Sequence, residues 1–109
     1  MIHVTVFRDS SRLVKGIEYK GHAGYAEYGQ DIICSAMSAL ALNMANSVEA
    51  FTDDPFDGQV DEENGGFTFH FTGAVSRESK LLMDSLILGI TNIREAYGNE
   101  YINIRYREV

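Results

Sequence analysis

The sequence predicts a single α/β domain, a two-layer sandwich in which a mixed sheet of about five strands packs against two helices in the order ββαββαβ. Two kinds of periodicity support this fold class. Several short segments alternate apolar and polar residues, as half-buried strands do, and two longer stretches repeat apolar residues at helical spacing. No linker, repeat or low-complexity segment interrupts the 109 residues, so we expect one domain over residues 1–109.

Two alternating segments open the chain, at residues 1–8 and 13–20. The polar run at 9–11 predicts a turn between them, so the opening should be a hairpin. We expect Leu13 to face inward at the start of the second strand, together with the apolar residues that alternate after it. This strand ends just before His22 and therefore places His22 at the end of the hairpin.

A helix is predicted from residue 31 to about residue 51. Asp31 can cap it by accepting hydrogen bonds from free backbone N–H groups, and Pro55 stops it because the residue before a proline leaves helical geometry. The stripe expected to face the sheet consists of Ile33, Met37, Leu40, Met44 and Val48. A second face is small enough for a substrate, a second subunit or merely a neighbouring helix to approach closely, and it consists of Cys34, Ser38, Ala41 and Ala45.

The second half of the chain repeats this arrangement. A strand around 58–61, a polar turn at 62–66 and a phenylalanine-rich strand at 67–72 form a predicted hairpin, because Asn-Gly between such segments is a strong hairpin signal. A helix capped by Ser76 should then extend to Tyr97, followed by a last strand at 101–108. With both helices on one face of the sheet, the other face would be partly apolar, would carry Phe7 and Tyr101, and would suit an interface.

Composition excludes several classes of function. The net charge of −7 argues against a direct nucleic-acid partner, whose phosphates require clustered Lys and Arg, and suits a basic partner instead. We expect no membrane partner, since the apolar runs are too short to span one and the N-terminus lacks the order of a signal peptide. The single cysteine cannot form an internal disulfide, so a reducing cytoplasm is the expected location.

The loop and helix start between residues 21 and 38 carry the candidate chemistry. Cys34 is the third residue of the predicted helix, where free N–H groups and the helix dipole favour a thiolate and lower a thiol pKa. His22 lies at the other end of the loop, and the glycines between them give the chain freedom to fold back. The pattern indicates a Cys/His dyad, and N–H groups at the helix start would hold the oxyanion of acyl transfer.

Simpler explanations compete with this dyad. A lone cysteine in a helix is usually a small buried side chain, and a histidine after a strand is often a turn residue. Cys34 with the scattered His3, His22 and His70 lacks the paired spacing of zinc motifs, so we expect no metal and no other cofactor.

A family resemblance strengthens the catalytic interpretation. The run Gly21-His22-Ala23-Gly24, then Glu27-Tyr28-Gly29, then Asp31 to Ala36 and Ser38 closely resembles the signature of the bacterial ribosomal-processing cysteine protease (Prp) family. The resemblance implies a cysteine endopeptidase that removes a short N-terminal extension from a large-subunit ribosomal protein, cutting after two phenylalanines. It also implies that His22 and Cys34 are the catalytic dyad and that the protein is a homodimer.

The remaining signature positions have less definite roles. Asp31 and Ser38 are possible supporting residues, and Asp31 either caps the helix, orients His22, or does both. Substrate contacts are expected from the loop residues Gly21, Gly24, Glu27 and Gly29. Two alternatives to a protease stay open on sequence grounds: a noncatalytic module that binds a ribosome-assembly partner, and a redox sensor in which Cys34 is oxidised.

Overall fold

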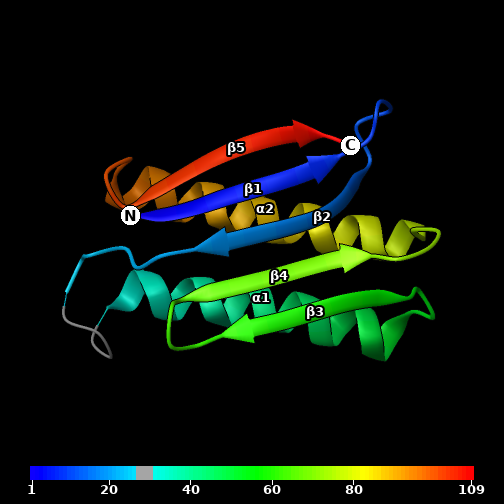
Figure 1. Ribbon diagram of the computed structural model, residues 1–109, viewed down its shortest axis with the longest axis horizontal. Helices are drawn as coiled ribbons and strands as arrows, with labels where there is room; N and C mark the ends of the chain where they lie inside the picture. The colour runs from blue at the N-terminus through cyan, green and yellow to red at the C-terminus, as the bar shows by residue number, and fades with distance from the viewer. Residues whose placement is uncertain (27–30) are drawn as a thin grey trace.

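The computed structural model describes residues 1–26 and 31–109 and contains one five-stranded sheet with two helices (Figure 1). The predicted order ββαββαβ is confirmed. The strands lie in the spatial order β3-β4-β2-β1-β5, and both helices lie behind the sheet in the view of Figure 1. The elements are β1 (Ile2–Arg8), β2 (Val14–Lys20), α1 (Ile32–Phe51), β3 (Phe56–Asp61), β4 (Gly66–Phe71), α2 (Arg77–Tyr97) and β5 (Ile102–Glu108).

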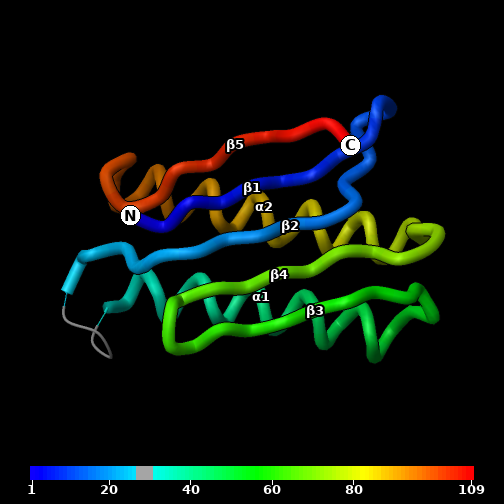
Figure 2. The backbone as a smooth tube through the Cα atoms, viewed as in Figure 1, coloured from blue at the N-terminus to red at the C-terminus, as the bar shows by residue number. Residues whose placement is uncertain are grey.

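The sheet is mixed, as predicted. β1 pairs antiparallel with β2 and parallel with β5, with Ile2 opposite Ile102, and these two strands run side by side in Figure 2. β4 pairs antiparallel with β2 and with β3. One consequence is that the end of β2, the β3–β4 turn and the start of α1 all lie at the same end of the molecule, on the left of Figure 1.

The predicted inward position of Leu13 is wrong. The β1–β2 register shifts between Phe7 and Arg8, so that Phe7 lies opposite Gly16 while Arg8 lies opposite Val14. Such a bulge changes which side chain faces the core. Val14 packs against the core in the place expected for Leu13.

The caps of both helices are confirmed. Asp31 accepts hydrogen bonds from the N–H groups of Ile33 and Cys34 at the start of α1. The Ser76 hydroxyl accepts from Ser79 N–H at the start of α2 (3.2 Å), and Gly98 follows this helix with φ 119°. Because these groups satisfy donors that the helix itself leaves unpaired, each helix begins at a defined residue.

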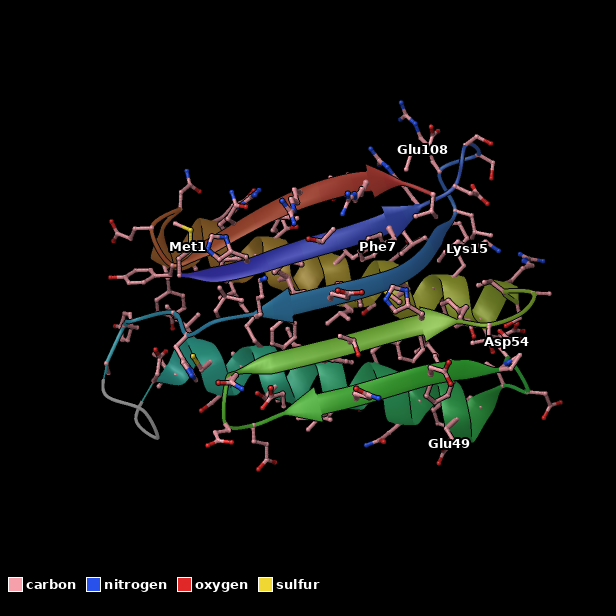
Figure 3. The ribbon with its side chains drawn as sticks, in the orientation of Figure 1. Met1, Phe7, Lys15, Glu49, Asp54 and Glu108 are labelled. Carbon is pink, nitrogen blue, oxygen red and sulfur yellow. The ribbon has the colours of Figure 1, made fainter. Side chains whose placement is uncertain are left out.

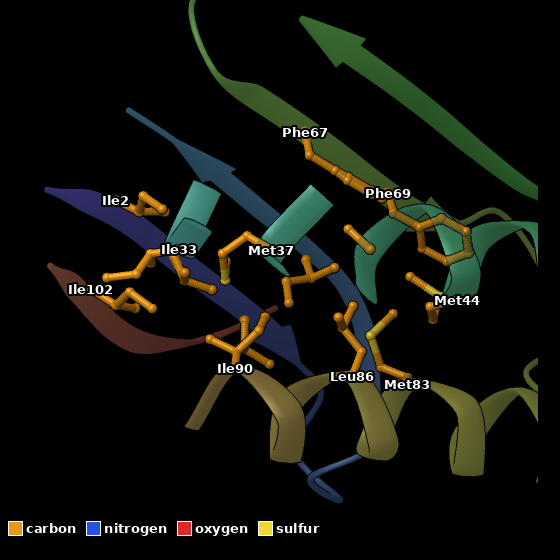
Figure 4. Close-up of a cluster of buried hydrophobic side chains, with 14 of the residues drawn as sticks. Ile2, Ile33, Met37, Met44, Phe67, Phe69, Met83, Leu86, Ile90 and Ile102 are labelled. Atoms are coloured by element: carbon orange, nitrogen blue, oxygen red, sulfur yellow. The ribbon is translucent and has the colours of Figure 1, made fainter. Parts of the chain in front are cut away.

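The core lies between the helices and one face of the sheet (Figure 4). α1 buries Ala41 rather than the expected Leu40, which is partly buried and packs towards α2. A Cβ added at Gly89 of α2 would lie 2.8 Å from Leu40 Cδ1, so the glycine is what lets the two helices approach this closely. Phe67 and Phe69 of β4 face this core, and Phe69 is fully buried.

The face of the sheet away from the helices is more polar than expected. Phe7 lies on it and its ring contacts that of His70, with centroids 5.2 Å apart. His70 Nε2 in turn lies 2.6 Å from a carboxylate oxygen of Glu18. Tyr101 is not on this face, since it precedes β5 and packs against Tyr25 with ring centroids 5.4 Å apart. No helix in the described part of the chain is long and apolar enough to cross a membrane.

Candidate active site

Cys34 and His22 line the same pocket, at the end of the sheet where β2 leads into α1. The pocket has a volume of about 220 Å³, and the β3–β4 turn forms its opposite wall. Figure 3 shows this end of the sheet beside Met1, whereas Lys15 and Glu108 mark the far end. The fold therefore brings together the two residues that the sequence predicts as a dyad.

The sulfur of Cys34 is half-buried and accepts a hydrogen bond from Ala23 N–H at 3.3 Å. Burial raises the pKa of the Cys34 thiol, and the negative charge of Asp31 raises it further, while the Ala23 hydrogen bond opposes the shift. The expected lowering of this pKa by the helix start is therefore wrong. A raised pKa favours the thiol over the thiolate, so a nucleophilic role requires a base beside it.

Asp31 is almost completely buried, with 4% of its surface exposed, and accepts three backbone hydrogen bonds. Its Oδ1 accepts from the N–H groups of Ile33 (3.0 Å) and Cys34 (3.1 Å), and its Oδ2 accepts from Tyr25 N–H (3.1 Å). Burial alone would raise the pKa of Asp31, but the hydrogen bonds from Cys34, Tyr25 and Ile33 outweigh it and lower the pKa. Asp31 thus ties the loop to the helix.

This arrangement changes the expected source of oxyanion stabilisation. The N–H groups of Ile33 and Cys34 already donate to Asp31, and Ser35 N–H donates to the Asp31 carbonyl. The first turn of α1 therefore does not offer these donors to a ligand as the sequence interpretation supposed. Ala23 N–H, from the loop, is the donor that reaches the sulfur.

The backbone around His22 is fixed by close contacts. Gly21 has φ 100°, and a Cβ added there would lie 2.5 Å from the Met1 carbonyl oxygen, so no other residue fits this position without movement. The amino group of Met1 donates to the His22 carbonyl oxygen at 2.7 Å. The ring of His22 lies against Gly65 of the β3–β4 turn.

Ser38 lies one helical turn after Cys34 and lines the same pocket, together with Tyr19 of β2. Burial raises the pKa of the Tyr19 hydroxyl, and hydrogen bonding to Ser38 partly offsets this effect. Tyr19 also packs edge-on against Phe67, with centroids 5.5 Å apart. The small face predicted for α1 thus borders the pocket at three of its positions, those of Cys34, Ser38 and Ala41.

The loop residues predicted to contact substrate are only partly described. Gly24 has φ 75°, and a Cβ added there would meet no atom within 4 Å. Glu27 and Gly29 lie outside the described residues. Tyr25 packs edge-on against Tyr97 and Tyr101.

Three residues of the site lack a functional signal in the sequence. The sequence predicts Tyr19 as an inward strand residue, Gly65 as a turn residue and Tyr101 as part of a strand. The fold nevertheless brings Tyr19 and Gly65 to the pocket, and it brings Tyr101 against Tyr25 of the loop. Long-range pairing of strands creates these contacts, and local patterns do not encode it. Among residues 1–26 and 31–109, His, Cys, Asp and Glu form no group of three that could hold a metal ion.

Comparison with known proteins gives consistent matches over nearly the whole chain. The family model described as cysteine protease Prp matches residues 1–103. The ribosomal processing cysteine protease Prp of Staphylococcus aureus strain Mu50 is 28% identical over 107 residues, which cover 98% of this chain and all of that protein. The protein of the same name from Bacillus subtilis strain 168 is 28% identical over 101 residues, covering 89% of this chain and 90% of that one.

A solved structure matches the fold closely. It is the crystal structure of an essential ribosomal processing protease Prp from S. aureus in complex with a covalently linked product peptide. The two folds superpose with a TM-score of 0.91 at 28% identity, over 98% of this chain and all of the other.

Proposed function

The chain belongs to the cysteine protease Prp family, and from this membership we propose that it removes an N-terminal extension from a large-subunit ribosomal protein, with Cys34 as nucleophile and His22 as base. The observation that carries the proposal is the shared pocket, which brings the thiol and the imidazole to one cavity of about 220 Å³. The S. aureus relative is described as a ribosomal processing protease and was crystallised with a covalently linked product peptide. A peptide is thus the substrate class that the comparison supports.

The raised pKa of the Cys34 thiol determines the first step. His22 takes the thiol proton as the Cys34 sulfur attacks the scissile carbonyl, so the S–C bond forms and an oxyanion develops. Ala23 N–H, which already donates to the sulfur, stabilises the negative charge as the thiol ionises. The C–N bond then breaks, and protonated His22 returns its proton to the leaving amine.

Water completes the cycle. His22 removes a proton from water, which attacks the thioester, and the carboxylic product leaves as the thiol is restored. The side chains that would hold the peptide are the mainly apolar ones along the pocket, with acidic groups at its rim. Asp61 and Glu62 of the β3–β4 hairpin supply these acidic groups, and with the net charge of −7 they favour a basic substrate.

The test is incubation of the purified protein with a ribosomal protein that carries an N-terminal extension, followed by mass measurement of the products. A shortened protein and a released peptide are expected. Cys34→Ser should abolish the reaction because oxygen is far less acidic and nucleophilic than sulfur, and His22→Ala should slow it by roughly 10²–10⁴-fold. Binding without cleavage would indicate a noncatalytic module, and oxidation of Cys34 without cleavage would indicate a redox sensor.

A homodimer is part of the same proposal, supported by the charge distribution on the sheet face away from the helices. Arg105 and Arg107 lie on this face along β5, whereas Asp57 and Asp61 lie on it along β3, at the opposite edge. A second copy related by a two-fold axis would set the basic edge of one against the acidic edge of the other. Sedimentation should give a dimer that weakens at high salt, and a monomer at micromolar concentration would contradict the proposal.

Location and further partners complete the proposal. A cytoplasmic location fits the single cysteine, which a reducing compartment keeps as a free thiol. The acidic net charge supports a protein substrate rather than direct contact with nucleic acid.

A further inference from the structure

A glycine from the β3–β4 turn lies directly against the imidazole of His22. Gly65 has φ 68°, in the left-handed region that favours glycine. A Cβ added there would lie 2.9 Å from Cε1 and 3.1 Å from Nδ1 of His22, and 2.6 Å from the carbonyl oxygen of Gly21. These separations are shorter than ordinary van der Waals contact, so only a residue without a side chain allows the ring edge to lie where it does.

The turn that presents Gly65 is held in shape by its neighbours. Asp61 Oδ1 accepts from Asn64 N–H at 3.2 Å, and Asp61 Oδ2 accepts from the Asn64 side-chain amide at 2.9 Å. Directly after the turn, Gly66 is paired with Asp61 in the β3–β4 ladder. The backbone of Gly65 therefore forms a fixed surface rather than a loop that adapts to the ring.

The contact also involves the loop that carries the histidine. The Gly21 carbonyl, which an added Cβ would approach most closely, belongs to the residue before His22. A side chain at Gly65 would thus press on both the ring and the backbone that carries it. The backbone cannot move freely, because Gly21 is packed against the Met1 carbonyl and the His22 carbonyl accepts from the Met1 amino group, so the ring is the part that is displaced.

We propose that Gly65 is a positioning residue for His22. The backbone of the β3–β4 turn at Gly65 sets how the imidazole lies in the pocket relative to Cys34. The effect on catalysis rests on the proposed function, whereas the effect on the ring does not. A displacement of about 1 Å in a catalytic group can cost about 10²-fold in rate. We expect Gly65→Ala to lower kcat by about 10–100-fold and to change KM less, since the affected group acts in the chemical step.

Two further variants separate ring displacement from backbone strain. Gly65→Asn adds the same Cβ, but asparagine tolerates a positive φ better than alanine does. Gly98→Ala is the matched control, because Gly98 also has a positive φ (119°) and its added Cβ would only come within 3.6 Å of the Glu100 side chain. Both Gly65 variants should lose activity, whereas Gly98→Ala should lose stability and keep kcat.

The direct readout is the NMR signal of the histidine Cε1–H group. The chain has three histidines, so the signals of His3, His22 and His70 can be assigned with single substitutions. Both Gly65 variants should shift the His22 signal and leave the other two unchanged, and Gly98→Ala should shift none.

An unshifted His22 signal, or a kcat equal to that of Gly98→Ala, would overturn the proposal. So would unfolding of both Gly65 variants, because the glycine would then serve the fold rather than the ring. If the wild type cleaves no extended ribosomal protein but the His22 signal shifts as described, the proposed function fails and the positioning of the ring stands.

Discussion

Replacing Asp31 with asparagine tests how the site holds its loop and its cysteine together. The carboxylate accepts three N–H groups, two on Oδ1 and one on Oδ2. Asparagine has one accepting oxygen, which can keep the cap to Ile33 and Cys34. Its NH₂ group, in the buried position of the Asp31 carboxylate, then faces Tyr25 N–H, so two donors meet in a contact that is partly buried.

The cost follows from that mismatch. A buried donor without an acceptor costs about 1–3 kcal/mol, so Asp31→Asn should lose about that much stability. Each kcal/mol corresponds to a fall in Tm of about 4–8 °C in a domain of nearly this size. Asp31→Ala should lose the cap as well, about 0.5–2 kcal/mol more. Thermal unfolding followed by circular dichroism measures both, with Asp53→Asn as the control, because Asp53 is an exposed aspartate just beyond α1.

The same variant should make the thiol more reactive. Asp31 raises the pKa of Cys34 through its charge and its hydrogen bond, so asparagine should lower that pKa and speed alkylation at pH 7.5. A stable Asp31→Asn protein with the Tm of the control and an unchanged alkylation rate would refute the reasoning. Acid should lower the stability of the wild type for a related reason. Because the fold lowers the pKa of Asp31, the ionised carboxylate contributes to the free energy of unfolding at neutral pH, and this contribution is lost as pH falls below about 3.8.

Three other predictions follow from packing and caps. Gly24→Ala should lower the free energy of unfolding by about 1–2 kcal/mol because of the positive φ alone, since an added Cβ meets no atom within 4 Å. Cleavage should fall by more than this loss of stability explains. A fall in activity that only follows the fraction unfolded would show that the role of this glycine is structural. Phe69→Ala should lower the free energy of unfolding by about 3–5 kcal/mol because the ring is fully buried, as measured by urea denaturation. Ser76→Ala should cost about 0.5–2 kcal/mol by removing the cap of α2, and a Tm equal to that of the wild type would show that Asp54, which accepts from Ser76, maintains the helix start alone.

Much of the fold is encoded locally and could be predicted for that reason. Asp31 and Ser76 each stand immediately before a stretch of helical periodicity, and Asn64-Gly65 stands between two strands, so the element order follows from neighbouring residues alone. The incorrect predictions, such as the inward position of Leu13, concern residues whose orientation depends on a non-local contact. The shift at Arg8 and Val14 depends on how two strands pair, and no alternation within either strand reveals it.

The candidate site divides in the same way. Cys34 and His22 could be selected because a helix start and a glycine-rich loop are visible in the sequence. The pKa of Cys34 could not be predicted from the sequence, because it depends on burial and on the placement of Asp31 beside the sulfur. If Asp31 served only as a helix cap, asparagine could replace it with little loss of stability, and the hydrogen bond from Tyr25 N–H is what changes that expectation.

The parallel pairing of β1 with β5 affects when the site can form during synthesis. Ile2 of β1 lines the pocket, and the Met1 amino group holds the His22 carbonyl, so the site needs β1 in place. On one side β1 pairs with β5, and the ribosome synthesises β5 after all the other strands of the sheet. Closing a contact across so long a stretch of chain is entropically costly and slow, so the pocket should mature only once β5 has emerged.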